Sequence, residues 1–270
     1  MFTSLKPTGL REPIRYDHVM DPSLSPHSLE GPILVLTGAG ISAESGVPTF
    51  RGAGGLWRSF RPEELATPDA FARDPALVWE WYRWRRDLVA RCAPNAAHLA
   101  LARLALASDD VTVVTQNVDG LHATAAREVA GGADPSRASP LELHGALFRD
   151  RCTRCAWNVD VREVTPPLDE RGLPACPRCG GLARPGVVWF GEALDHALLE
   201  QAFAAAEAAR TCLVIGTSGL VHPAASLPLA ALDAGAAVIE VNPEPTPLTP
   251  RATRSLRGSA VAIVPELLRI

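Results

Sequence analysis

Four cysteines in two close pairs are the most specific chemical feature of this 270-residue sequence. Cys152 and Cys155 form one C-x-x-C pair, and Cys176 and Cys179 form a second pair further along the chain. Thiolates at this spacing surround Zn²⁺ as a tetrahedron, and four protein ligands leave no position for water. We therefore predict one structural zinc ion per chain, which would add about 10 to 16 kcal/mol of apparent binding energy to a small lobe. A redox dithiol pair is the alternative, but it requires an exposed thiolate with a low pKa.

A glycine-rich segment is the second candidate for chemistry. The segment Gly38-Ala39-Gly40-Ile41-Ser42-Ala43 follows an apolar run and fits the pattern G-x-G-x-x-G/A. Glycines in this pattern let the backbone approach a pyrophosphate at the start of a helix. The acidic residue expected about 20 positions later is missing, because residues 47–57 read as a loop. The segment therefore predicts a dinucleotide site that differs from that of an ordinary dehydrogenase.

Histidine and an aromatic–arginine pair could also carry chemistry. A histidine such as His144 is mostly neutral at cellular pH and can accept a proton. From spacing alone, His122 is an equally good candidate for this proton acceptor. Tyr82 and Arg85 are three positions apart in a predicted helix and therefore share a face. A phenol and a guanidinium together can bind a small carboxylate. The alternative is that the ring of Tyr82 packs inward while Arg85 is solvated.

The elements that must position these residues form an alternating pattern. Short apolar runs, typical of parallel strands covered on both faces, occur at 33–37, 111–115, 212–216 and 238–241, with a fifth expected at 260–264. Helical patterns occur at 75–91, at 95–107 with Asn95 as the N-cap, at 195–209 and at 223–234. This alternation predicts an α/β protein with a doubly wound parallel sheet. Ligands of such sheets bind at the carboxyl ends of the strands, where small and polar residues follow four of these runs.

Composition narrows the classes of function. The chain has 47% hydrophobic and 21% charged residues, which is typical of a globular protein. Its net charge of -4 disfavours nucleic acid and anionic membranes as partners. No apolar run reaches the about 18 residues of a membrane helix, and the N-terminal segment has no signal-peptide core. We therefore expect a cytoplasmic protein.

Taken in order, the motifs resemble the sirtuin family over nearly all of the chain. The resemblance rests on the four cysteines and on Gly38-Ala39-Gly40-Ile41-Ser42, Thr49-Phe50-Arg51, Gln116-Asn117-Val118-Asp119, His144-Gly145, Val188-Trp189-Phe190-Gly191-Glu192, Gly216-Thr217-Ser218 and Val241-Asn242-Pro243. It implies an NAD-dependent protein-lysine deacylase that acts on acylated lysines of proteins and releases nicotinamide and O-acyl-ADP-ribose. The oligomeric state is not indicated, and a monomer is compatible with the sequence.

The resemblance also implies a division of the chain. A Rossmann-like NAD-binding domain and a smaller domain follow an N-terminal arm. The expected boundaries are 1–30 for the arm; 31–55, 92–147 and 188–270 for the NAD-binding domain; 56–91 for the helical part of the small domain; and 148–187 for its zinc-binding part.

Individual roles follow from the same resemblance. His144 becomes the general base. The residues expected to contact NAD are Gly38, Ala39, Gly40, Ser42, Thr49, Phe50, Arg51, Trp57, Gln116, Asn117, Asp119, Gly216, Thr217, Ser218, Asn242, Glu244 and Ala260. The residues expected to contact the substrate are Tyr82, Arg85, Val188, Phe190, Gly191 and Glu192. Of these, 190–192 would pair with the peptide backbone as an added strand.

Within the family, Tyr82-x-x-Arg85 resembles the pair of the class III branch, which removes succinyl, malonyl and glutaryl groups. The segments 50–55 and 65–68 also resemble that branch, whereas Pro62 replaces its usual small alanine and bears on the width of the acyl pocket. Acetyl-lysine is then expected to be a slower substrate. Three alternatives stay open: a plain NAD-dependent deacetylase, an ADP-ribosyltransferase acting on protein, and a zinc ribbon that binds nucleic acid, the last disfavoured by the net charge.

Overall fold

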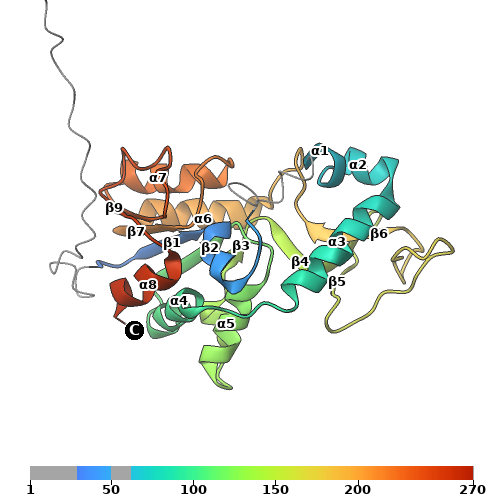
Figure 1. Ribbon diagram of the computed structural model, residues 1–270, viewed down its shortest axis with the longest axis horizontal. Coiled ribbons are helices and arrows are strands. Elements are labelled where there is room, and N and C mark those ends of the chain that lie inside the picture. Colours follow the sequence, from blue (N-terminus) through green and yellow to red (C-terminus); the bar gives the residue numbers. More distant parts are fainter. Residues whose placement is uncertain (1–28, 50–61, 270) are drawn as a thin grey trace, which may run out of the picture.

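The computed structural model describes residues 29–49 and 62–269, which form two lobes, each built around its own sheet (Figure 1). The six-stranded sheet of the large lobe has the order β3-β2-β1-β7-β8-β9. Its strands are β1 (Ile33–Thr37), β2 (Val111–Thr115), β3 (Leu141–Glu142), β7 (Thr211–Ile215), β8 (Ala237–Val241) and β9 (Arg254–Leu256). All of the pairings in this sheet are parallel, as the sequence predicts for a doubly wound fold.

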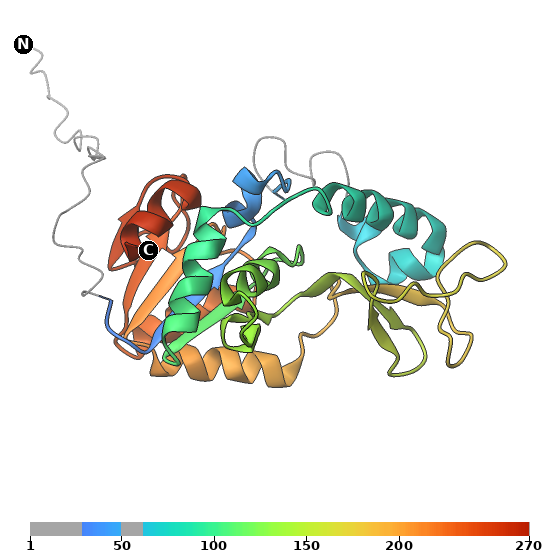
Figure 2. The same ribbon diagram turned by 90° about the horizontal axis from the view of Figure 1, so that it is seen from below.

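Helices cover both faces of the large sheet, which explains why β1 is buried along its whole length. Successive side chains of a strand point to opposite faces. Ile33 and Val35 pack into the core beneath α4 (Ala96–Ala107), α5 (Leu121–Ala130) and α8 (Ala260–Leu268). Leu34 and Leu36 pack against α6 (His196–Ala208) and α7 (Leu227–Asp233). Figures 1 and 2 show these two helical layers on either side of the sheet.

The predicted strand at 260–264 is wrong, because this segment is the first part of α8. The side chain of Ser259 caps the helix by accepting a hydrogen bond from the backbone N–H of Ala262. Val264, Leu267 and Leu268 then point into the core. A run of five apolar residues shows no period by itself, so the helical spacing becomes visible only when the residues after 264 are included.

The other predicted elements of the large lobe occur with small shifts. Asn95 caps α4, since its side-chain oxygen accepts hydrogen bonds from the N–H groups of Ala97 and His98. The helix expected at 223–234 begins as a 3-10 turn at Ala224–Ser226 and continues as α7. The short strands β3 and β9 were not expected from the sequence.

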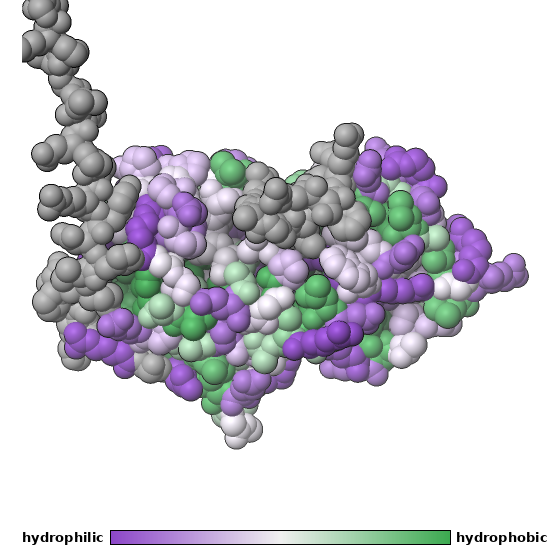
Figure 3. Space-filling view, viewed as in Figure 1, coloured by the Kyte–Doolittle hydropathy of each residue, from purple (hydrophilic) through white to green (hydrophobic). Residues whose placement is uncertain are grey.

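Within the described residues, the small lobe combines three helices with a three-stranded antiparallel sheet of order β5-β4-β6. Its elements are α1 (Pro62–Leu65), α2 (Pro68–Arg73), α3 (Pro75–Val89), β4 (Gly145–Cys152), β5 (Asn158–Asp160) and β6 (Ala183–Val187). Arg86 of α3 fastens the helix to β4 by donating to the carbonyl of Leu147 at 2.7 Å and to the carboxylate of Asp150 at 2.6 Å. Hydrophilic side chains cover much of the end of this lobe that lies away from the large lobe (Figure 3).

Among the described residues, none of the helices has the length and apolar character needed to cross a membrane.

Candidate functional site

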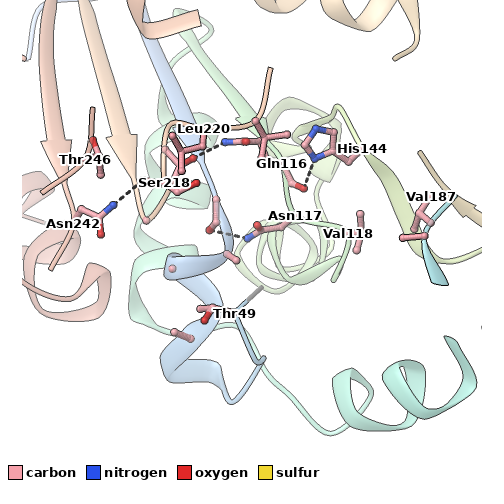
Figure 4. A pocket seen from close by; sticks show the side chains of 18 of the residues that line it. Thr49, Gln116, Asn117, Val118, His144, Val187, Ser218, Leu220, Asn242 and Thr246 are labelled. Atoms are coloured by element: carbon pink, nitrogen blue, oxygen red, sulfur yellow. Dashed lines mark hydrogen bonds between the residues drawn. The ribbon is translucent and has the colours of Figure 1, made fainter. Parts of the chain in front are cut away.

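A cleft of about 720 Å³ runs from the carboxyl ends of β1, β2, β7 and β8 toward the small lobe. Figure 4 shows side chains from several loops pointing into it, among them Gln116, Asn117, Ser218 and Asn242. His144 and Val187 lie where the cleft reaches the small lobe. The cleft is therefore at the edge of the sheet where ligands of such folds bind.

Backbone contact between two glycine loops shapes the cleft beside β1. The N–H of Gly40 donates to the carbonyl of Gly216 at 2.8 Å. A Cβ on Gly40 would come within 2.7 Å of the Cα of Gly216, and Gly216 itself has a φ of +62°. Larger residues would push the two loops apart, so the glycines bring main-chain atoms directly to the cleft wall.

Ser42 and Asp119 form a buried polar network behind that wall. Ser42 donates to the carboxylate of Asp119 at 2.7 Å, and the amide of Asn117 donates to Ser42 and to the carbonyl of Gly38 at 3.2 and 3.1 Å. Burial raises the pKa of Asp119, while hydrogen bonds from Leu121 and Ser42 and the charge of Arg85 oppose the shift. Asn117 and Gly38 line the cleft, so Ser42 and Asp119 fix residues that a ligand would touch.

His144 lies in the cleft wall with a defined tautomer. Its Nδ1 is 2.8 Å from the backbone carbonyl of Gln116 (Figure 4). A carbonyl only accepts hydrogen bonds, so Nδ1 carries the proton and Nε2 keeps a lone pair that can accept one. Burial lowers the pKa of His144, and the hydrogen bond to Gln116 partly opposes this. The arrangement suits a general base that is neutral at pH 7.

His122 lies in the protein interior. Its Nε2 is 2.9 Å from the hydroxyl of Thr37, and its ring packs edge-on against His98 with the centroids 4.8 Å apart. Burial and the nearby His98 lower its pKa well below the ordinary value. Of the two histidines that the sequence leaves open, only His144 lines the cleft.

The loops after β2, β7 and β8 are tied to one another. Gln116 donates from its side chain to the hydroxyl of Thr217 at 2.9 Å, and Asn242 donates to the backbone carbonyl of Thr217 at 2.7 Å. Ser218, Glu244 and Ala260 line the cleft near them. These predicted cofactor residues therefore meet at one place.

A buried carboxylate holds the last of these loops. Glu240 of β8 is 1% exposed and accepts hydrogen bonds from Thr246, from Thr249 at 2.7 Å and from Ser255 at 2.6 Å. Arg257 reaches the same carboxylate and also donates to the carbonyl of Glu244 at 2.8 Å. Because Glu244 and Thr246 line the cleft, Glu240 sets the position of this part of its wall.

Large side chains form the wall on the side of the small lobe. Tyr82 and Arg85 of α3 both line the cleft and are only 1% and 7% exposed, so the alternative of a solvated arginine is wrong. The Cζ of Arg85 lies 4.8 Å from the ring centroid of Trp81. The hydroxyl of Tyr82 accepts a hydrogen bond from the indole of Trp189 at 2.9 Å. Burial lowers the pKa of Arg85 and raises that of Tyr82.

The segment 188–192 continues this wall. Val188, Phe190 and Gly191 line the cleft, and the side chain of Phe190 is 47% exposed. The carboxylate of Glu192 accepts two hydrogen bonds from Arg184, at 2.6 and 2.9 Å, and further ones from Arg151. Glu192 thus fixes the local backbone through arginine pairs.

The four paired cysteines meet in the small lobe. The Sγ–Sγ distances are 3.5 Å for Cys152–Cys179, 3.6 Å for Cys155–Cys176 and 3.7 Å for Cys155–Cys179. A tetrahedral zinc site with Zn–S bonds of about 2.3 Å has sulfurs about 3.8 Å apart. The cluster therefore fits zinc, with all four positions supplied by the chain.

Some predicted residues are not placed by the structure, and some cleft residues were not predicted. Phe50, Arg51 and Trp57 lie outside the described residues, as does the side chain of Pro62. The cleft is also lined by residues for which the sequence predicts no role: Trp81, Val118, Trp189, Leu220 and Thr246. Trp189 and Val118 carry a usable signal, since each lies between two residues predicted to contact a ligand.

The doubly wound sheet, the glycine loops at its edge and the four-cysteine cluster define the class: an α/β protein of the dinucleotide-binding type with a four-thiol site that fits zinc. The chain belongs to the Sir2 family, whose model matches residues 38–223.

Relatives support this assignment over most of the chain. An NAD-dependent protein deacylase of Thermococcus kodakarensis is 50% identical over 240 residues, covering 87% of this chain and 89% of the relative. A solved Sir2 homologue variant in complex with ADP-ribose has a TM-score of 0.81 and 47% identity, covering 93% and 96% of the two chains. A Sir2 structure with a p53 peptide and NAD⁺ has a TM-score of 0.76 and 30% identity, covering 92% and 95%.

Proposed function

We propose that this chain is an NAD-dependent protein-lysine deacylase that prefers acyl groups ending in a carboxylate, such as succinyl, malonyl and glutaryl, over acetyl. Sir2 membership and the named relatives support the deacylase activity. The acyl preference depends on one observation, the buried pair of Tyr82 and Arg85 in the cleft wall. A guanidinium offers a fork of N–H donors that matches a carboxylate, and burial strengthens that attraction.

Different residues along the cleft would bind the cofactor and accept the proton. NAD, when bound, supplies a ribose carbon from which nicotinamide can leave, and the products would be nicotinamide and O-acyl-ADP-ribose. Nε2 of His144 accepts a proton from a ribose hydroxyl, since Nδ1 is engaged by the carbonyl of Gln116. Gly40, Gly216 and Asn117 form the wall against which the cofactor would lie.

We assign the remaining predicted residues to the same two ligands. Phe50, Arg51 and Trp57 are included in the cofactor set by the sequence resemblance alone. The segment 188–192 would hold the peptide that carries the acyl-lysine, and the two lobes would correspond to the NAD-binding and small domains. Cytoplasmic location fits the four thiols, which a reducing compartment keeps available for zinc.

Product analysis tests the proposal. The protein is incubated with NAD and matched peptides that carry acetyl-, malonyl-, succinyl- or glutaryl-lysine, and mass spectrometry measures the deacylated peptide and acyl-ADP-ribose. We expect acyl-ADP-ribose from all active peptides and a higher kcat/KM for the acidic ones. ADP-ribose attached to protein in place of acyl-ADP-ribose would indicate a transferase.

The substitution Arg85→Met tests the acyl preference directly. Methionine keeps an apolar chain of similar length but removes the charge. Loss of a charge-assisted hydrogen bond costs about 1.5 to 3 kcal/mol, so kcat/KM for succinyl-lysine should fall about tenfold to a hundredfold while that for acetyl-lysine changes little. Arg83→Met is the matched control, because Arg83 lies on the same helix but is exposed and donates to the carbonyl of Gly172. Equal losses on both peptides would disprove the acidic-acyl preference.

A further inference from the structure

Trp189 links the peptide segment of the cleft to the acyl wall. It is 3% exposed, and its indole Nε1 donates to the hydroxyl oxygen of Tyr82 at 2.9 Å. The two residues are far apart in the sequence and come from different elements, α3 and the segment after β6. This bond restricts the direction in which the hydroxyl of Tyr82 can donate its proton.

The direction of the bond fixes the proton of Tyr82. An indole N–H is a donor and never an acceptor, so the oxygen of Tyr82 must be the acceptor in this pair. The phenolic proton therefore points away from Trp189. Arg85 also hydrogen-bonds to this oxygen, and a guanidinium only donates. In the part of the chain that the structure describes, neither Trp189 nor Arg85 therefore accepts the phenolic proton of Tyr82, which lines the cleft. The proton is thus available to an acceptor that enters the cleft.

The ring of Trp189 is held from several sides. The Cζ of Arg184 lies 3.3 Å from the ring centroid, and the same guanidinium is paired with Glu192. The backbone N–H of Trp189 donates to Glu192 at 2.8 Å, and the ring of Phe71 packs against the indole with centroids 5.2 Å apart. These contacts leave the indole little freedom to rotate away from Tyr82.

We propose that Trp189 is a positioning residue for acidic acyl groups, which turns the hydroxyl proton of Tyr82 toward the acyl carboxylate beside Arg85. This inference rests on the proposed function, because it concerns how the same wall recognises its acyl group. A carboxylate is an acceptor only, so it is bound by a hydroxyl that donates and opposed by one whose lone pairs face it. Acetyl has no carboxylate and gains nothing from this orientation.

The expected effect is on binding and not on chemistry. The acyl carboxylate takes no part in bond making, so its contacts are equal in the ground state and the transition state and appear in KM. Loss of the neutral hydrogen bond from Trp189, which orients the hydroxyl of Tyr82, should raise KM for succinyl-lysine about three- to tenfold. KM for succinyl-lysine should rise more than KM for acetyl-lysine, so the ratio of succinyl to acetyl kcat/KM falls, while kcat for succinyl-lysine changes less than its KM.

Trp189→Phe is the test, because phenylalanine keeps an aromatic ring against Arg184 and Phe71 and loses the N–H. The matched control is Trp79→Phe. Trp79 is also fully buried in the small lobe, stacks with Arg86 and donates its indole N–H at 3.1 Å, but to the carbonyl of Ala183. Thermal unfolding of both variants reports any general loss of stability. The control should leave the ratio of succinyl to acetyl activity unchanged.

A double-mutant cycle with Tyr82→Phe separates positioning from packing. Once the hydroxyl is gone, Trp189→Phe should have almost no further effect on KM for succinyl-lysine. Additive losses, equal losses on acetyl- and succinyl-lysine, or the same change in Trp79→Phe would overturn the inference. If the unsubstituted protein treats both peptides alike, the proposed acyl preference fails and this inference fails with it. If it prefers succinyl and Trp189→Phe retains that preference, only this inference fails.

Discussion

The two ends of the cleft are built in opposite ways. At the end beside β1 and β7, the wall is main chain: Gly40 and Gly216 touch through their backbones. At the end beside α3, the wall consists of large buried side chains, Tyr82, Arg85 and Trp189. A backbone wall changes only if loops move, whereas a side-chain wall changes with one substitution. We therefore expect cofactor binding to change only with substitutions that move the loops, and acyl preference to change with the exchange of a single wall side chain.

Zinc removal should have the largest effect and should act on one lobe. The four cysteines that would hold the metal all lie in the small lobe, and the apparent binding energy of such sites is about 10 to 16 kcal/mol. Chelation should abolish deacylation of every acyl peptide and disorder the small lobe. The large lobe has its own two core clusters and should keep its secondary structure by circular dichroism. Full activity in a sample shown to contain no zinc would contradict the prediction.

His144→Ala should be nearly as damaging but independent of the acyl group, because His144 lies between the two ends. Loss of a general base lowers kcat about 10²- to 10⁴-fold. Calorimetric binding of NAD should be retained, since the glycine loops are untouched. His196→Ala serves as the control, because the side chain of His196 is 85% exposed at the start of α6. A variant that keeps a near-normal rate would remove His144 as the base.

Gly40→Ala tests the backbone end. The added Cβ would lie 2.7 Å from the Cα of Gly216, which is too close for any real contact. Overpacking of this kind costs about 1 to 3 kcal/mol, so KM for NAD should rise about fivefold to a hundredfold. The ratio of succinyl to acetyl activity should not change. Gly31→Ala is the control, because its Cβ would meet Asp110 at an ordinary 3.5 Å. A changed acyl ratio in Gly40→Ala would show that the two ends are coupled.

The smallest effect concerns pH. Burial lowers the pKa of His144, so its neutral form, the one that accepts a proton, persists below the ordinary value of about 6.5. The kcat should therefore be constant around neutral pH and fall only as the pH drops through this lowered pKa. Rate profiles with acetyl- and succinyl-lysine should share this limb. A limb at or above the ordinary pKa would contradict the burial argument.

Local patterns explain what the sequence predicted correctly. The strands at 33–37 and 111–115 are short runs of aliphatic and β-branched residues. Each cysteine pair has its characteristic spacing within four consecutive residues. The segment 260–264 was assigned wrongly because five apolar residues do not distinguish a strand from a buried helix. Strand β3 has two residues and β9 has three, which leaves too little pattern to recognise.

Tertiary partners explain what the sequence did not predict. The bond between Trp189 and Tyr82 joins positions 107 residues apart, and no local rule relates them. Burial of Arg85 is likewise a property of the packed small lobe, since its helix alone is compatible with a solvated arginine.

The role of Glu240 in the large lobe also depends on tertiary partners. Its carboxylate is contacted by Thr249, Ser255 and Arg257, which meet it only after β8 and β9 pair.

The hydrogen bond that orients His144 has a consequence for how the protein tolerates sequence change. Its acceptor is the carbonyl of residue 116, which belongs to the main chain and exists whatever side chain stands there. Enzymes that orient a histidine with an aspartate can lose the correct tautomer through one substitution at that aspartate. Here no single exchange of a side chain deletes the acceptor. The tautomer of the base is therefore protected against point mutation at residue 116. A substitution there would change only the side-chain contacts of Gln116, such as its hydrogen bond to Thr217.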